Sequence, residues 1–285
     1  MLALIAGSVV LATRHTPSGT GRSRQAGQKL TPAAAAGTLA AAWVAGQVSR
    51  SVTVSCDPAM CAALQQRGFP AGNLVIAGRG ALDPRDSSLI VVTAALRNEL
   101  GRRLDSEYAP VVLAVLGAGN DKIEIRASAP DGPAAYQSQF NADFAARKSV
   151  GTELLLNPNV EADQPARQQL SEGRVDSRLI GMIGIMAMMH PVHLVSFGDA
   201  SPGASPEVPL RSALLYGVAH GATAGTAVLG SLRTLLLAQR PSYRPAGVRI
   251  VRLTAGRNAL RIEFTAPDPL GLLDASQPLV KISSP

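Results

Sequence analysis

The chain has 285 residues, of which 46% are hydrophobic, 16% are charged and 4% are aromatic. This is enough apolar material for one large or two modest folded domains, and it excludes a disordered body. The formal charge is +7, yet residues 1–50 contain five basic residues and no acid. The remaining 235 residues contain 22 basic and 20 acidic side chains. A nearly neutral body with few aromatic rings indicates no nucleic-acid partner.

Residues 1–13 are almost wholly apolar, and a polar, basic stretch follows over residues 17–28. The apolar run suits the core of a signal peptide and is shorter than the roughly 20 residues that a spanning helix needs. Because no basic residue precedes it, we interpret residues 1–30 in two ways. They are a signal remnant whose true start lies upstream, or an unconventional membrane anchor with a basic linker. A buried N-terminal element of a cytosolic enzyme is the remaining alternative.

Residues 31–130 predict a three-layer α/β unit. A helix is expected over residues 32–49, with Thr31 as its N-cap, and another begins at Asp57-Pro58 and stops at Gly68. A third is expected over residues 94–104. Strands are expected at residues 52–55, 74–77, 89–93, 111–116 and 122–127. Two of them, residues 89–92 and 111–116, are almost continuously apolar, which indicates a sheet covered on both faces.

Cys56 and Cys61 are the two cysteines of the chain, and they lie where the first strand meets its helix. That spacing allows a disulfide, which would favour an exported protein. Two buried free thiols are the alternative. The C-x4-C spacing is not that of a thiol oxidoreductase, and there is no second cysteine pair to complete a structural zinc site.

Residues 131–285 predict a mostly helical α+β unit with a small sheet. Helical patterns run from residue 133 towards 173, over residues 175–189 and over residues 222–239. A short strand is expected at residues 192–197. Residues 248–253 and 259–264 should form a closing hairpin. A polar loop rich in Gly, Ser and Pro lies between the second helix region and the third, at residues 198–209.

Candidate catalytic residues are few. His190 and His193 with Asp199 lack the spacing of a known metal motif, so we expect no metal and no cofactor. The segment from residue 198 to Arg211 is the best candidate for an exposed site, since long polar loops at strand ends often have functional roles. His193, Asp199 and Arg211 are therefore the weak catalytic candidates, and a histidine half-buried in packing is the competing interpretation of His193.

A weak resemblance covers about 55 residues. It rests on Trp43-Val44, the segment from Val52 to Asp57, Gly68-Phe69-Pro70, Asp83-Pro84 and the segment from Ile90 to Thr93. This pattern resembles the extracytoplasmic α/β domains of actinobacterial membrane proteins, including the soluble tails of polytopic glycosyltransferases. Those transferases have many membrane helices and this chain has at most one, so the resemblance does not imply transferase activity.

A fainter similarity links Arg174-Val175-Asp176 and the segment from His190 to His193 to extracellular D-alanyl peptidases. The metal-binding H-x6-D motif of those enzymes is missing, since no acid follows His220 at any comparable spacing. The peptidase similarity therefore implies no metal site in this chain.

These observations together predict an extracytoplasmic protein of the cell envelope, tethered to the membrane by its N-terminal segment or secreted. Its expected partner is a cell-envelope glycan or a membrane protein, and we expect no chemistry of its own. The rival hypothesis is an enzyme that acts on envelope polysaccharide or peptidoglycan through the 198–211 loop. An enzyme requires two or more titratable groups that face each other in a pocket.

Deletion of residues 1–30 should leave a folded protein, because a short apolar run and a polar basic spacer cannot join a core. The truncated chain should remain soluble and melt cooperatively when followed by circular dichroism. Aggregation, or loss of most of its secondary structure, would show that this segment belongs to the fold.

Overall fold

The computed structural model describes residues 30–77, 83, 86–198, 201–218, 222–254 and 256–273. The predicted anchor and linker, apart from Leu30, lie outside these residues. Thr31–Pro285 forms one compact unit. Among the described residues, no helix combines the length and apolar character that crossing a membrane requires.

The first sheet has five strands in the order β2-β1-β3-β5-β4. The strands are β1 (Val54–Cys56), β2 (Leu74–Ile76), β3 (Leu89–Val92), β4 (Tyr108–Leu116) and β5 (Ile123–Ser128). β1 runs parallel to both β2 and β3, whereas β5 runs antiparallel to β3 and β4. All five strands lie where the sequence predicts them, within three residues at each end.

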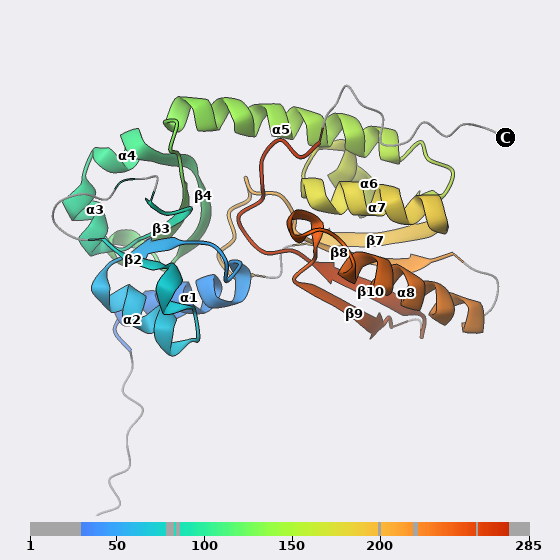
Figure 1. Cartoon of the computed structure of the whole chain (residues 1–285), viewed down its shortest axis with the longest axis horizontal. Coiled ribbons are helices and arrows are strands. Elements are labelled where there is room, and N and C mark those ends of the chain that lie inside the picture. Colours follow the sequence, from blue (N-terminus) through green and yellow to red (C-terminus); the bar gives the residue numbers. More distant parts are fainter. Residues whose placement is uncertain are drawn as a thin grey trace, which may run out of the picture. The chain divides into compact units, whose positions relative to one another are not determined.

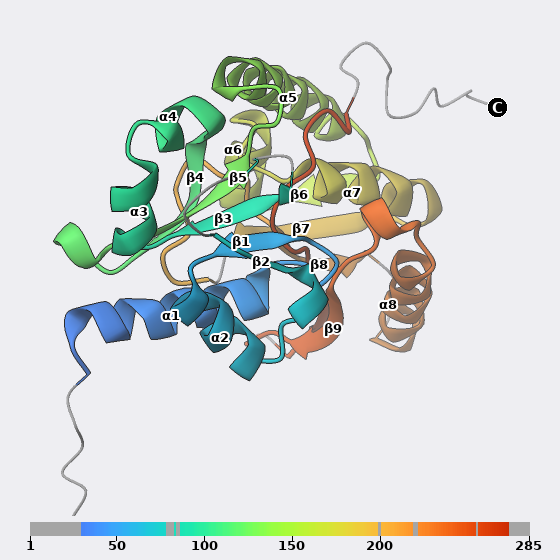
Figure 2. The same ribbon diagram turned by 60° about the vertical axis from the view of Figure 1, so that its left-hand side comes forward.

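Helices cover both faces of the first sheet, as Figure 2 shows. α1 (Pro32–Gln47) and α2 (Pro58–Gln66) lie on one face, and α3 (Ala94–Leu100) and α4 (Arg103–Glu107) lie on the other. The alternation of β3 explains this arrangement, because Leu89 and Val91 join the core under α1 and α2 while Ile90 and Val92 join the core with α3. The near-continuous apolar run of β3 thus serves two cores.

Local capping starts these helices where the sequence indicates. The Thr31 hydroxyl accepts a hydrogen bond from the Ala34 amide at 3.3 Å, and Asp57 Oδ1 accepts one from the Met60 amide at 2.9 Å. The helix predicted over residues 94–104 is instead two helices. Gly101 adopts a φ of +51° between them, a conformation that side chains with a Cβ rarely adopt.

The second half contains a second five-stranded sheet in the order β6-β7-β8-β10-β9. The strands are β6 (Val160–Ala162), β7 (Val192–Gly198), β8 (Ser212–Gly217), β9 (Gly247–Arg252) and β10 (Asn258–Glu263). More residues of this half lie in helices than in strands, as expected, but the expectation of a small sheet is wrong. Two strands were missed. β6 lies inside a stretch predicted as helix and has only three residues, and β8 directly follows the polar loop with a sequence, SALLYG, that lacks regular alternation.

The helices of the second half are α5 (Pro133–Leu154), α6 (Gln164–Ser171), α7 (Ser177–Met189) and α8 (Ala222–Leu237). Residues from α5 to α8 share one apolar core with Leu194, Leu215 and Ile262 of the sheet. The neighbouring strand positions His193, Tyr216 and Arg261 point to the opposite face. In the described part of the chain, α6, α7 and α8 therefore lie on a single face of the second sheet.

The longest helix, α5, contributes to the cores of both halves (Figure 1). Tyr136 near its start packs against the first core, whereas Val150 and Leu154 near its end belong to the second. The sequence suggests an aromatic stripe of Tyr136, Phe140 and Phe144 as its buried face, but Phe144 is 43% exposed. One rigid helix thus links the two regions.

The two halves repeat the same order of elements. Each begins with a helix and a strand, continues through one or two helices to two consecutive strands, and ends with helix and hairpin. In both sheets the second strand of the final hairpin lies next to the strand that precedes the helix, as in β3-β5-β4 and β8-β10-β9. The halves differ in the first strand pair, since β1 is internal and β2 outermost, whereas β6 is outermost and β7 internal.

The predicted disulfide is present between Cys56 at the end of β1 and Cys61 in the first turns of α2. Both residues are buried, and their Cα atoms lie 5.5 Å apart. The bond joins the strand to the helix that follows it. A disulfide is consistent with an oxidising, extracytoplasmic location.

Replacing both cysteines, as Cys56→Ala/Cys61→Ala, should lower the free energy of unfolding by about 2 kcal/mol, because the bond closes a short loop in the unfolded chain. Urea denaturation of the double variant and the parent protein measures this difference. Alkylation and intact mass of unreduced exported protein test the bond itself. Two alkylated thiols in that sample would show that it does not form.

Candidate functional site

A crevice of about 620 Å³ opens in the first half at the carboxyl ends of β1 and β3. These strands are parallel neighbours, but β1 leads through α2 to β2 on one side and β3 leads through α3 and α4 to β4 on the other. The chain therefore diverges between them. Ligands of open α/β sheets bind at such a topological switch point, outside the carboxyl ends of the strands.

Small side chains line most of this crevice. On α1 they are Ala33, Ala34, Gly37, Thr38 and Ala41, and on α2 they are Ala59 and Ala63. Met60 and Ile123 add larger apolar surface, and Gln66, Arg67 and Asp121 add polar groups. No aromatic side chain is among the lining residues. The walls therefore offer close approach and apolar contact more than directional hydrogen bonding.

The polar groups at the base of the crevice already have partners. Asp57 Oδ1 accepts the Met60 amide, and its Oδ2 accepts the Thr93 hydroxyl at 2.5 Å. Thr93 in turn caps α3 by accepting the Leu96 amide at 3.4 Å. These groups fix the starts of α2 and α3, so their role is structural. They do not form the pair of nucleophile and general base that covalent catalysis requires. This geometry suits binding.

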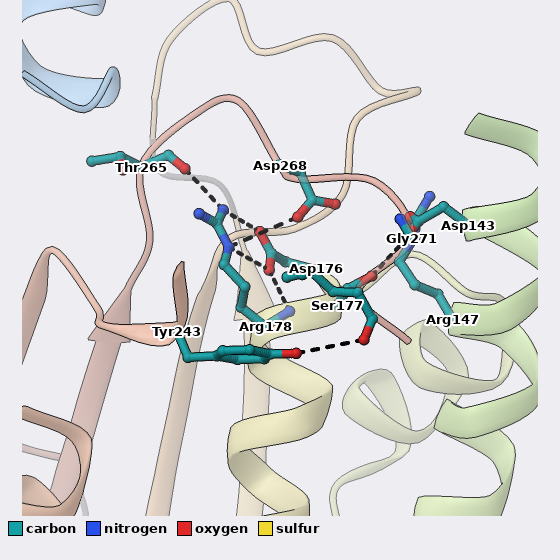
Figure 3. A network of polar contacts seen from close by, with 10 residues as sticks. Asp143, Arg147, Asp176, Ser177, Arg178, Tyr243, Thr265, Asp268 and Gly271 are labelled. Carbon is teal, nitrogen blue, oxygen red and sulfur yellow. Dashed lines mark hydrogen bonds and ion pairs between the residues drawn. The ribbon is translucent and has the colours of Figure 1, made fainter. Parts of the chain in front are cut away.

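Charged side chains converge instead in the interior, where α5 and α7 meet the segment after β10 (Figure 3). Asp176 caps α7 and forms an ion pair with Arg178 at 2.6 Å, and Arg178 also donates to the Thr265 carbonyl at 2.8 Å. On α5, Asp143 forms an ion pair with Arg147 at 2.8 Å. Asp143 also accepts the Ser177 hydroxyl and the Gly271 amide. The network joins distant parts of the sequence.

Asp268 is the fifth charged member of this network, and its carboxyl is the least satisfied. Its side chain is 6% exposed and lies 3.8 Å from Arg178 Nε, too far for a hydrogen bond. Among the described residues, no group donates a hydrogen bond to either carboxyl oxygen. Burial raises the pKa of Asp268 well above its usual value, and the charges of Asp176 and Asp143 add to this while Arg178 opposes it.

A cavity of about 380 Å³ adjoins Asp268 and is lined also by Ser87, Ser128 and Tyr136. Burial, helped by the charges of Asp268 and Asp143, raises the pKa of Tyr136 to about 12, so its phenol stays protonated. Both carboxyl oxygens of Asp268 and the Ser128 hydroxyl are closed to solvent. A substrate in this cavity would therefore not reach the carboxyl oxygens. The charged side chains face one another, as an active site requires, but a substrate cannot reach them.

The described contacts of His193 are with residues that were not predicted as catalytic. Its ring nitrogens face Glu161 at 3.0 Å and Asp163 at 2.9 Å, and its ring stacks on Tyr216 with centroids 4.6 Å apart. His190 instead ends α7, where its amide bonds to the Met186 carbonyl. His193 is half-buried, as its packing interpretation requires, but its contacts are carboxylates and an aromatic ring.

Arg211 lies at the far end of β8 from Tyr216, roughly 15 Å along the strand from the His193 stack. It is 5% exposed, and its guanidinium sits 5.5 Å above the Trp43 ring of α1. Asp199, the third candidate, lies outside the described residues, as does His220. His193 and Arg211 therefore do not share a site.

The polar loop before Arg211 is engaged by the first sheet. Gly203 accepts a backbone hydrogen bond from Val115 at 2.8 Å, and Ser205 donates one to Leu113 at 3.0 Å. A Cβ on Gly203, whose φ is +83°, would lie 2.6 Å from the Val115 carbonyl oxygen. From residue 201 onwards, this loop is thus a strap along β4, which explains its small residues without a catalytic role.

Sequence reasoning missed the crevice and the charged network. The crevice residues look like ordinary helix formers, because small side chains on α1 and α2 give no chemical pattern. The network had one visible sign, the pair Asp143 and Arg147 four residues apart on a helix. Its burial depends on segments more than 100 residues away, such as Gly271.

Among the described residues, no group of three or more His, Cys, Asp or Glu side chains could hold a metal ion. Comparison with protein-family models, with curated proteins and with solved structures finds no match to this chain. The geometry of its own residues is therefore the basis for the function proposed below.

Asp268→Asn should stabilise the protein at neutral pH. The pKa of Asp268 is raised on folding, so its stabilising contribution is complete at acidic pH, below the pKa in the unfolded chain. That contribution is lost as the pH rises through the pKa in the folded protein. The amide stays neutral at every pH and so avoids the loss that ionisation of Asp268 causes. We expect a gain on the order of 1 kcal/mol or more, because a tenfold preference for the protonated form is worth about 1.4 kcal/mol.

Thermal melts of Asp268→Asn and of the parent protein between mildly acidic and mildly alkaline pH measure this effect. The exposed Asp131→Asn serves as the control for loss of one negative charge. A variant that melts lower than the parent protein at every pH would show that the charged carboxylate of Asp268 stabilises the fold.

Proposed function

We propose that this chain is an extracytoplasmic binding or accessory protein of the cell envelope that holds its partner in the crevice between α1, α2 and α3. The observation that supports this most is the crevice itself, which is open, about 620 Å³ in volume and placed at the switch point of a parallel strand pair.

The lining favours a membrane-protein partner over a glycan. Ala33, Gly37 and Ala41 follow one another every four residues on one face of α1, and Ala59 and Ala63 do the same on α2. Small side chains at this spacing allow a helix to approach closely. Ligand pockets with precise hydrogen bonding usually combine aromatic walls with convergent polar groups. This crevice lacks aromatic walls, and its central polar groups bond to one another.

The absence of catalysis is part of this proposal. His193 pairs with Tyr216 at one end of β8, whereas Arg211 precedes the other end. The carboxyl oxygens of Asp268 are closed to solvent. The loop before Arg211 is hydrogen-bonded along β4. These contacts support a structural role for the groups that an envelope-acting enzyme would have used.

Location outside the cytoplasm is likewise proposed. The buried disulfide between Cys56 and Cys61 supports it, because such bonds persist in oxidising compartments. The apolar run at residues 1–13 supports a membrane tether or export segment ahead of the folded unit.

Filling the crevice should abolish partner binding without harming the fold. Nothing lies within 4 Å of a Cβ built on Gly37, so the side chain of Gly37→Leu extends into open space. A Cβ on Gly46, near the end of the same helix and outside the crevice, is equally unhindered. Both substitutions remove a helical glycine and should stabilise α1, by up to ~1 kcal/mol at Gly37. Gly46→Leu is therefore the matched control.

The measurement is photo-crosslinking in the producing cell, with the reactive residue at Thr38 inside the crevice or at the exposed Leu39 beside it. We expect a protease-sensitive adduct of defined mass from Thr38 that is lost in Gly37→Leu and kept in Gly46→Leu. Equal adducts from both positions would argue against the crevice as the binding site. An adduct removed by a peptidoglycan hydrolase would identify a glycan partner instead.

A further inference from the structure

The positive charge of the folded unit is concentrated in one segment. Residues 208–262 contain eight arginines and no Asp, Glu or Lys, whereas residues 51–207 contain 13 basic and 17 acidic side chains. The near neutrality of the body therefore conceals two regions of opposite sign. Such asymmetry directs a protein towards an anionic partner.

These arginines lie on adjacent elements of the second half. Six of them are exposed, on α8, in the segment after it and on the β9–β10 hairpin: Arg233, Arg240, Arg244, Arg249, Arg252 and Arg257. α8 packs against β9 and β10. Because α8 packs against β9, the outermost strand of the sheet, Arg233 of α8 and Arg252 of β9 belong to neighbouring elements.

Local contacts neutralise only part of this charge. Glu263 accepts two hydrogen bonds from Arg249, both at 2.8 Å, and Arg257 lies 4.4 Å above the Tyr216 ring. Within the described residues, no acidic side chain pairs with Arg233, Arg240 or Arg252. These three guanidinium groups are therefore available to an external anion.

Exposed apolar side chains accompany the arginines. Leu237 is 45% exposed and Ile250 is 43% exposed. Arg233 and Leu237 lie four residues apart on one face of α8, and Arg240 follows three residues after the helix ends. On β9, Ile250 and Arg252 share the face that α8 covers, because they pair with Leu260 and Asn258. Guanidinium and apolar groups thus alternate across both elements.

We propose that this arginine surface, formed by Arg233, Leu237, Arg240, Arg244, Ile250 and Arg252, docks on an anionic lipid bilayer. The guanidinium groups match phosphate headgroups, and the two exposed apolar side chains match the boundary between headgroups and acyl chains. A soluble polyanion would use the arginines but give Leu237 and Ile250 no apolar environment. The surface would add a second contact to the membrane, independent of the N-terminal segment and of the crevice.

The test is co-sedimentation of the full chain with phosphatidylcholine vesicles that contain or lack phosphatidylglycerol. The relevant quantity is the increase in binding caused by phosphatidylglycerol, which separates the arginine surface from any insertion of the apolar N-terminus into neutral lipid. Arg233→Gln/Arg240→Gln/Arg252→Gln should reduce that increase on the order of 100-fold, since each arginine near an anionic surface contributes about 1 kcal/mol. Raising the salt concentration should also reduce the binding that phosphatidylglycerol adds, because salt screens charges at the surface.

The matched control is Arg50→Gln/Arg102→Gln/Arg174→Gln, which removes three exposed arginines outside this surface. It should keep most of the binding. Leu237→Ser/Ile250→Ser should lower binding to anionic vesicles and leave binding to soluble polyphosphate unchanged. If both arginine variants lost the same amount of vesicle binding, net charge alone would explain the binding, and the proposed arginine surface would be wrong. Binding to polyphosphate without a preference for anionic vesicles would reject the lipid assignment.

Discussion

Three carboxyl groups and two guanidinium groups meet where α5, α7 and the segment after β10 come together, and the tertiary structure depends on how they are satisfied. Arg178 pairs with Asp176 and also bonds to the Thr265 carbonyl, so the C-terminal segment is fixed to the start of α7. Asp143 holds the same segment through the Gly271 amide. Breaking a buried pair on one side is strongly destabilising because it leaves an uncompensated charge. α5, α7 and the C-terminal segment are therefore mutually dependent.

The two halves share one order of elements along the chain, but the first strand is internal in one sheet and outermost in the other. This difference explains why the halves have different surfaces. In the first sheet β1 lies between β2 and β3 and is parallel to both, so two helices begin at neighbouring strand ends and leave a crevice there. In the second sheet β7 and β8 are antiparallel neighbours, so the carboxyl ends of these two strands lie at opposite ends of the sheet. The same element order thus supports two different kinds of surface.

The sequence predicts those parts of the fold that depend on short-range chemistry. Thr31 and Asp57 cap their helices through groups three residues away, and the continuous apolar run of β3 indicates two covered faces. The sequence did not reveal that the polar loop lies along β4, because its partner strand is nearly 90 residues earlier, as Gly203 and Val115 show. The crevice and the arginine surface were missed for related reasons. Their residues are ordinary one by one, and only the packing of α1 on α2, or of α8 on β9, groups them.

The strap over β4 has a consequence for the behaviour of the protein at high concentration. An outermost strand with free amides and carbonyls is a template on which another copy can add a strand and begin an aggregate. On β4, Gly203 and Ser205 occupy backbone groups of that rim. β2 and β6, the outer strands elsewhere, are only three residues long, and β9 places charged arginines along its rim. Each rim of the two sheets is thus protected in its own way against open-ended polymerisation.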